Sequence, residues 1–179
     1  MYYGKVLLRH TVADAAGSAV WAMHNPAAST GNIFLREIFL RLGFDGTAAA
    51  TSSIGYELWR FTTADPTTGT TVPRIKRKSA YSNSFIADAN IQQKSGILTM
   101  TSVVYDADAF SALLIPASAT AISDWLLLQF PFNDIVNGET SFVFAPNEGL
   151  AIRIATGFAA IIGQSLSGHV AWSERAVNR

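Results

Sequence analysis

Apolar and polar residues alternate most regularly in the last quarter of the chain. Leu150, Ile152 and Ile154 are separated by Ala and Arg residues, which is the period of two that buries one face of a strand and exposes the other. Residues 140–144 and 169–172 alternate in the same way, and the Pro-Asn-Glu-Gly run before Leu150 consists of turn residues. We therefore predict three strands joined by short turns, forming one antiparallel sheet with an apolar face that the rest of the chain must cover.

Two further strands are predicted near the N-terminus. Val6 and Leu8 occupy alternate positions in a segment that begins almost at the first residue. Trp21 and Met23 also occupy alternate positions, and an Asn-Pro pair ends this second run. We expect the first strand to be tied into a sheet early in the chain.

The segment 32–44 fits two structures. A helix would bring Leu35 and Ile38 to one face, whereas a strand would place alternate apolar residues on one face with an interruption at Arg36. Turn residues flank the segment, and aromatic residues and isoleucine are frequent in it. The pattern favours a long strand, and a helix is the alternative.

Residues 54–61 are predicted to form a strand that is apolar on both faces. Tyr56 and Leu58 lie on one face, and Trp59 and Phe61 lie on the other. A strand of this kind buries one face in a sandwich and needs cover on the other. We predict that Trp59 and Phe61 lie in a contact between subunits.

The remaining segments complete an all-β pattern. Residues 96–104 alternate, and residues 124–130 are apolar at nearly every position, as a central strand would be. In total about nine or ten short strands are separated by turn signals at intervals of about 8–12 residues, without an alternating helical pattern or an internal repeat. The sequence predicts an all-β chain, a sandwich of antiparallel strands with few or no helices.

Composition adds an expectation about assembly. The 179 residues are 49% hydrophobic and only 15% charged, against about 25% charged in soluble domains. The length is that of one domain, so we treat residues 1–179 as a single β-sandwich. Uncharged surface on this scale is commonly covered in oligomers, and we expect a homo-oligomer.

Charge and targeting signals exclude several classes of partner. Basic and acidic residues balance at 13 each, so we expect neither nucleic acid nor an anionic membrane as partner. The chain has no cysteine, which is compatible with a reducing cytosol. Neither a signal peptide nor an apolar run of about 18 residues is evident.

No motif predicts a reaction centre. The three histidines, His10, His24 and His169, are scattered, and Asp106 and Asp108 resemble only the start of a calcium loop. The chain has no nucleophile elbow, phosphate loop or dinucleotide fingerprint. We therefore predict no catalytic residue, no metal and no cofactor, and we expect that the protein is not an enzyme.

One cationic run is the best candidate for a binding feature. Arg74, Lys76, Arg77 and Lys78 lie within five positions, with Ile75 between the first two. They could bind an acidic protein surface. The alternative is an edge strand whose charges prevent unwanted pairing.

Several short motifs resemble small β-rich virion proteins of tailed bacteriophages, the cement or decoration proteins of the capsid exterior. The motifs are Trp21 followed by Asn25-Pro26, the run 33–38, the run 146–153 and the run 170–174.

The resemblance implies a jelly roll of eight or more strands, often trimeric, that binds the outer surface of the head between major capsid subunits and stabilises it. The protein would be assembled in the host cytoplasm and located on the virion. Arg74, Lys76, Arg77 and Lys78 are the candidate contacts with the major capsid protein.

Two other functions stay open from the sequence. A tail, fibre or baseplate module could bind another tail protein, or a host glycan on aromatic platforms such as Trp59, Tyr81 and Trp125. A cupin-type enzyme would require the three histidines to converge on a metal.

Overall fold

The computed structural model describes residues 2–10, 14–44, 54–63, 65–76, 90–94, 97–115, 126–131, 142–156 and 163–176. Within these residues it contains fifteen strands and no helix. Every pairing between strands is antiparallel. The predicted all-β class is therefore confirmed.

One sheet has six strands in the order β12-β3-β15-β1-β7, with β13 also paired to β3. Its strands are β1 (Tyr2–Arg9), β3 (Gly31–Phe44), β7 (Arg74–Lys76), β12 (Leu126–Pro131), β13 (Val143–Phe144) and β15 (Gln164–Ala176).

The second sheet has seven strands in the order β10-β4-β14-β2-β8-β6, with β11 also paired to β4. Its strands are β2 (Ala19–His24), β4 (Ile54–Thr62), β6 (Thr70–Thr71), β8 (Asn90–Gln93), β10 (Val104–Tyr105), β11 (Ser111–Ile115) and β14 (Glu148–Ile154). A separate pair consists of β5 (Pro66–Thr67) and β9 (Thr99–Met100).

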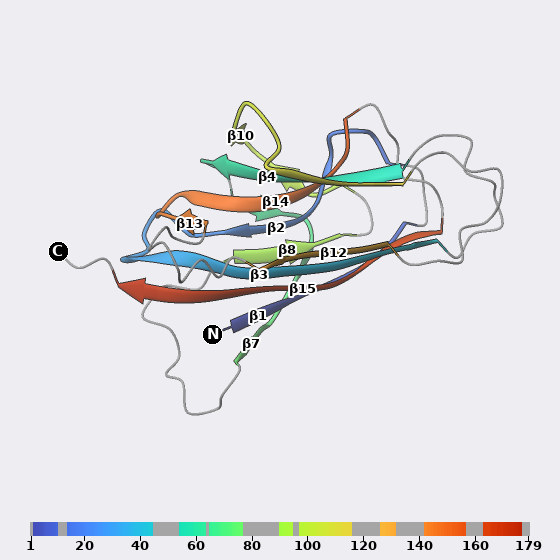
Figure 1. Cartoon of the computed structure of the whole chain (residues 1–179). Coiled ribbons are helices and arrows are strands. Elements are labelled where there is room, and N and C mark those ends of the chain that lie inside the picture. Colours follow the sequence, from blue (N-terminus) through green and yellow to red (C-terminus); the bar gives the residue numbers. More distant parts are fainter. Residues whose placement is uncertain are drawn as a thin grey trace.

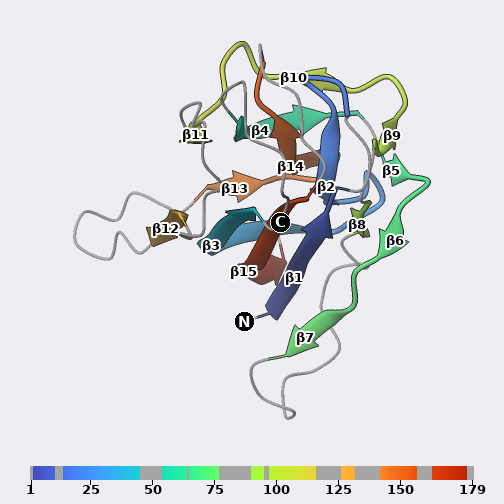
Figure 2. The same cartoon turned by 90° about the vertical axis from the view of Figure 1, so that its right-hand side faces the viewer.

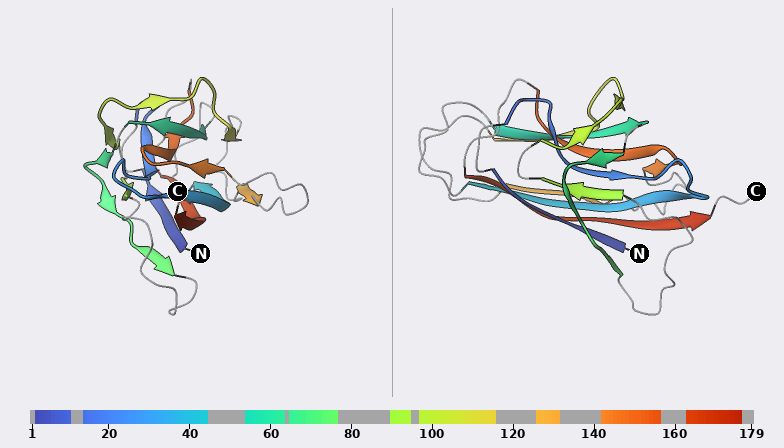
Figure 3. Two further views of the ribbon diagram at one scale, coloured as in Figure 1. Left: turned by 90° about the vertical axis from the view of Figure 1, so that its left-hand side faces the viewer. Right: turned by 180° about the vertical axis from the view of Figure 1, so that it is seen from behind.

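The two sheets pack as layers with the hydrophobic core between them. Figure 1 shows β4 and β14 above β3 and β15, and the view from behind in Figure 3 shows the same two layers. Trp21, Tyr56, Ile38, Leu40 and Trp172 are at most 1% exposed in this core. In the end-on view of Figure 2, β6 and β7 pass down one side of the sandwich from the seven-stranded sheet to the six-stranded sheet.

The predicted N-terminal strands are confirmed. In β1 the side chains of Val6 and Leu8 are buried and those of Lys5 and Leu7 are exposed, and β1 pairs with β15 along its whole length. In β2 all six residues are buried. The core covers one face, and the cluster that contains Leu98 covers the other.

The ambiguous segment is the strand β3, and a bulge explains its helix-like spacing. Along β15, Ala171 is paired with Glu37 but Trp172 is paired with Leu35, so Arg36 is an extra residue in β3. Leu35 before the bulge and Ile38 after it are both fully buried. An extra residue shifts the alternation by one, which changes a spacing of two into the spacing of three that a helix also shows.

The prediction of one sheet for residues 140–172 is wrong. Strand β13 pairs with β3 in the six-stranded sheet, β14 lies between β4 and β2 in the seven-stranded sheet, and β15 returns to the six-stranded sheet. The Pro-Asn-Glu-Gly run is therefore a crossing between the layers and not the turn of a hairpin. Each strand buries its apolar face against the opposite layer.

Two other predicted strands differ in the structure. Residues 96–104 do not form one strand, because β9 ends at Met100 and the chain turns at Ser102, which has a positive φ of 59°. Residues 124–130 were predicted to form a central strand. Among the described strands, β12 pairs only with β3, so it lies at the end of the six-stranded sheet.

No helix among the described residues is long and apolar enough to span a membrane.

Candidate functional site

The predicted subunit-contact residues lie on the outer face of the seven-stranded sheet, which the chain itself covers. Phe61 is fully buried in a cluster with Ala22, Leu98 and Ala151, and Tyr105 packs against this cluster. The segment that follows β8 thus supplies the cover that the sequence pattern required. Phe61 has no exposed area in the single chain, so the single chain offers no Phe61 surface for the predicted contact between subunits.

Trp59 is half-buried beside a cation. The guanidinium of Arg153 lies 4.7 Å from the centre of the Trp59 ring and 4.0 Å from that of Tyr105. Arg153 Nε also donates to the carbonyl of Gly17 at 2.7 Å, and the Trp59 indole N–H donates to Glu57 at 2.9 Å. We call these contacts of Arg153 with Trp59, Tyr105 and Gly17 the Arg153 clamp. The clamp connects β10 to the sheet, and it fixes Trp59 through contacts within the same chain.

Replacing Arg153 by lysine is expected to destabilise the protein by about 1–2 kcal/mol, since the planar guanidinium contacts two rings and lysine cannot reproduce this geometry. Urea unfolding would measure the change. A matched Lys94→Arg exchange at an exposed position should have almost no effect. Equal stability of the two variants would contradict the clamp.

The cationic run lies at the end of the six-stranded sheet. Arg74, Ile75 and Lys76 form β7, which pairs with the first residues of β1, whereas Arg77 and Lys78 lie outside the described residues. Ile75 is 53% exposed and is paired with Tyr3. The first three residues of the run therefore add a strand at the β1 side of the six-stranded sheet. Lys76 is paired with the buried Tyr2, whereas Ile75 is paired with Tyr3.

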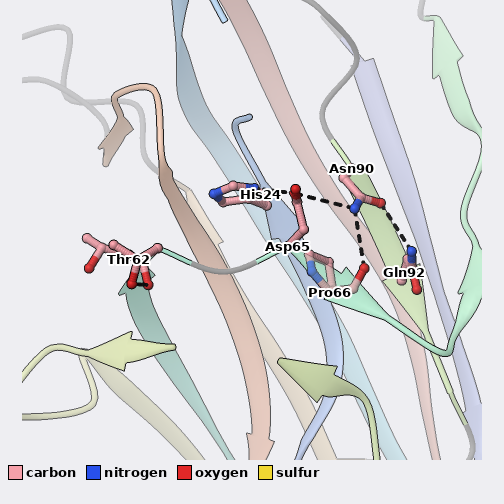
Figure 4. Close-up of polar contacts among 7 residues, drawn as sticks. His24, Thr62, Asp65, Pro66, Asn90 and Gln92 are labelled. Carbon is pink, nitrogen blue, oxygen red and sulfur yellow. Dashed lines mark hydrogen bonds and ion pairs between the residues drawn. The ribbon is translucent and has the colours of Figure 1, made fainter. Parts of the chain in front are cut away.

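His24 belongs to a polar network that connects three strands (Figure 4). Its Nδ1 lies 2.6 Å from a carboxylate oxygen of Asp65, to which it donates. The amide of Asn90 approaches the same oxygen at 3.5 Å and donates to the Pro66 carbonyl at 3.3 Å, and Gln92 donates to Asn90 at 3.4 Å. These bonds hold the start of β5 against β2 and β8, and the His24 ring stacks on Phe61.

His10 belongs to a second network, which is buried. Its Nδ1 lies 2.7 Å from Asp14 and its Nε2 lies 2.8 Å from the hydroxyl of Tyr56. A carboxylate only accepts, so Nδ1 donates to Asp14, and in the neutral ring with this tautomer Nε2 accepts from the Tyr56 hydroxyl. The sequence analysis missed Asp14, although its position four residues after His10 was the available signal.

Burial and the nearby charge of Asp14 raise the pKa of Tyr56 well above its usual range. The unfolded phenol ionises near pH 10 and the folded one does not, so stability is present below about pH 10 and is lost as pH rises above it, by up to about 1.4 kcal/mol per pH unit. Tyr56→Phe should cost about 1 kcal/mol at neutral pH through its lost hydrogen bond, and it should flatten the alkaline loss. Urea unfolding of both proteins between about pH 8 and pH 11 measures this; parallel curves would contradict it.

The third histidine, His169, lies on the outer face of the six-stranded sheet. We use "outer face" for the side of β3, β15, β1 and β7 that points away from β4 and β14 in Figure 1. There His169 stacks on Phe39 with ring centres 5.4 Å apart, and Tyr3 meets the His169 ring edge-on at 5.3 Å. The guanidinium of Arg41 lies 5.3 Å from the centre of the Phe39 ring.

Exposed aliphatic and cationic side chains surround these rings. Leu7 is 52% exposed and is paired with Ser167, and Ile75 is exposed beside Tyr3. Lys5 is exposed and is paired with His169. No described strand packs on this outer face. Among the described residues, its centre is apolar and aromatic and lies beside the exposed cation Lys5.

The three histidines do not converge. His10 is in the interior, His24 is under the β5 segment, and His169 is on the opposite outer face, where it lies 3.4 Å from Glu37. Within the described residues no group of three or more His, Cys, Asp or Glu is placed to hold a metal ion.

Comparisons with known proteins add no relative. No family model, curated protein or solved structure matches the chain.

The motif residues behind the resemblance have structural roles. The buried side chain of Asn25 donates to the carbonyls of Gly31 and Phe144 at 2.9 and 3.0 Å, which fixes the crossing between β2 and β3. Glu148 accepts from the backbone N–H of Ala145 and pairs with Arg60. These motifs specify connections in the fold.

Of the three aromatic platforms named for glycan binding, the structure describes Trp59. Trp59 is clamped by Arg153, and Tyr81 and Trp125 lie outside the described residues.

Proposed function

We propose that the protein is a structural protein of a bacteriophage virion, a cement or decoration protein that binds the outer surface of the head between major capsid subunits. It acts as a homotrimer and stabilises the shell by adding contacts between neighbouring subunits. It requires neither a cofactor nor a catalytic residue for this role.

The strand order supports the jelly-roll part of the proposal. Strands β1, β15, β3 and β12 are neighbours in one layer, and β2, β14, β4 and β11 are neighbours in the other. The strands are therefore paired from the two ends of the chain inward. Strand β1 pairs with β15, β2 with β14, β3 with β12, and β4 with β11. Eight strands in two such layers are typical of jelly rolls, which occur in viral capsid proteins, lectins and cupins.

The observation that carries the proposal is the outer face of the six-stranded sheet. Its centre contains Tyr3, Leu7 and Phe39, and the exposed parts of these side chains give it an apolar character. Exposed apolar patches with polar borders are typical of protein-binding surfaces. The cationic run begins in β7, which pairs with β1 at the end of this sheet, and Arg74, Lys76, Arg77 and Lys78 are retained as candidate capsid contacts.

Electron microscopy of virions from the phage that encodes the chain would test the proposal directly. Antibodies raised against the recombinant chain should label the heads, and light scattering should give the mass of a trimer. Label confined to tails or fibres would favour the tail module instead. Virions without label would overturn a virion role.

A further inference from the structure

We infer that the outer face of the six-stranded sheet binds an acidic protein surface with an apolar centre. This inference rests on the proposed function and names the chemistry of the partner. In the virion, the partner would be an acidic region of the capsid surface.

Cations outnumber carboxylates among the described side chains of this face. Among the described side chains, Lys5, Arg9 and Arg41 are exposed on it. The described carboxylate there is Glu37, which is 28% exposed and lies against His169.

The positions of the cations match an electrostatic role. Lys5 is paired with His169 and Arg41 with Ser167, so the two cations lie on either side of the central strand β15. Arg41 also covers part of the Phe39 ring. A partner that contacts the rings therefore has to meet both cations.

A second copy of the chain is a poor occupant of this face. A two-fold contact of the face with itself would bring its cations close together, and like charges across an interface oppose binding. An acidic partner removes this repulsion and attracts the face during encounter.

The experiment measures co-sedimentation of the purified chain with heads that lack it. Lys5→Glu combined with Arg41→Glu should weaken binding at least about tenfold, because two attractions become repulsions. The matched control is Lys94→Glu, which reverses an exposed cation beside β8 and should bind as the wild type does. Wild-type binding should also weaken between about 0.1 M and about 1 M salt, as the Debye length falls from about 10 Å to about 3 Å.

The outcomes separate this inference from the proposed function. Equal binding of the double variant, the control and the wild type would overturn the inference and leave the capsid role intact. A wild-type chain that does not bind heads would overturn both. Retention on a carboxylate resin, tested on the same proteins, should be reduced by the double variant more than by the control, and equal retention would count against a basic face.

Self-association of the chain through this face would also contradict the inference. If the wild type forms assemblies in light scattering that the double variant abolishes and the control does not, the face binds another copy of the chain. That result would overturn the assignment of an acidic partner.

Discussion

Replacing Gly168 by alanine is expected to destabilise the protein by about 2–6 kcal/mol, the sum of about 1–3 for a strained backbone and about 1–3 for overpacking. Gly168 has a φ of +148°, and an added Cβ would lie 1.9 Å from the carbonyl oxygen of Phe39. That atom belongs to the backbone of β3, so the neighbouring strand has to move. Since whole domains are stable by only about 5–15 kcal/mol, the variant should unfold at a far lower urea concentration or fail to fold.

Gly4→Ala is the matched control for this prediction. It adds the same methyl group to the adjacent strand of the same sheet, but the nearest atom is Cζ3 of Trp172, 3.2 Å away in a side chain. A small shift of that ring accommodates the methyl group, so the loss should be about 1 kcal/mol. Equal losses in the two variants would show that the close approach of β15 to β3 is not what requires Gly168.

Replacing Trp172 by alanine is expected to cost about 3–5 kcal/mol, the usual range for removing a large buried ring. Trp172 is fully buried in β15, its ring stacks on Tyr2 at 6.0 Å, and its indole N–H donates to Glu174 at 2.9 Å. The variant leaves a cavity between the sheets and removes the donor to a carboxylate. Urea unfolding followed by the fluorescence of the remaining tryptophans measures the change.

Trp172→Phe separates the two contributions. Phenylalanine keeps most of the ring and loses the N–H, so the cost should fall to about 1–3 kcal/mol, partly from the lost hydrogen bond to a charged group. An alanine variant no less stable than the phenylalanine variant would contradict the packing role of the ring.

The sequence predicted the strands well where one face is buried by the opposite layer. In β1 the alternation of apolar residues matches their burial, with Val6 and Leu8 buried. In β14 Ala151 is buried as well as Leu150 and Ile152, because another part of the chain covers its second face. Segment 32–44 was also predicted as a strand, but the bulge at Arg36 was visible only as an interruption. A bulge is defined relative to the partner strand, here β15. The pattern of β3 alone therefore shows that the apolar alternation shifts by one residue, but it does not show that a bulge causes this shift.

The candidate site was predicted less well. Trp59 and Phe61 were predicted to meet another subunit because the pattern shows that a face needs cover, and it does not show what covers it. The cover is a distant segment of the same chain that includes Leu98 and Tyr105. The outer face of the six-stranded sheet was missed, since its residues come from β1, β3, β7 and β15 and no single run of sequence contains them.

The sequence by itself determined that this protein is all-β and where most of its strands lie, because side chains alternate between the two faces of any extended chain. Only the tertiary structure decided that β13, β14 and β15 alternate between two sheets, that Phe61 is covered, and that Phe39 and His169 stack on the outer face of the six-stranded sheet. These features depend on contacts between residues far apart in the chain, and their choice follows from which pairing of strands buries the most apolar surface.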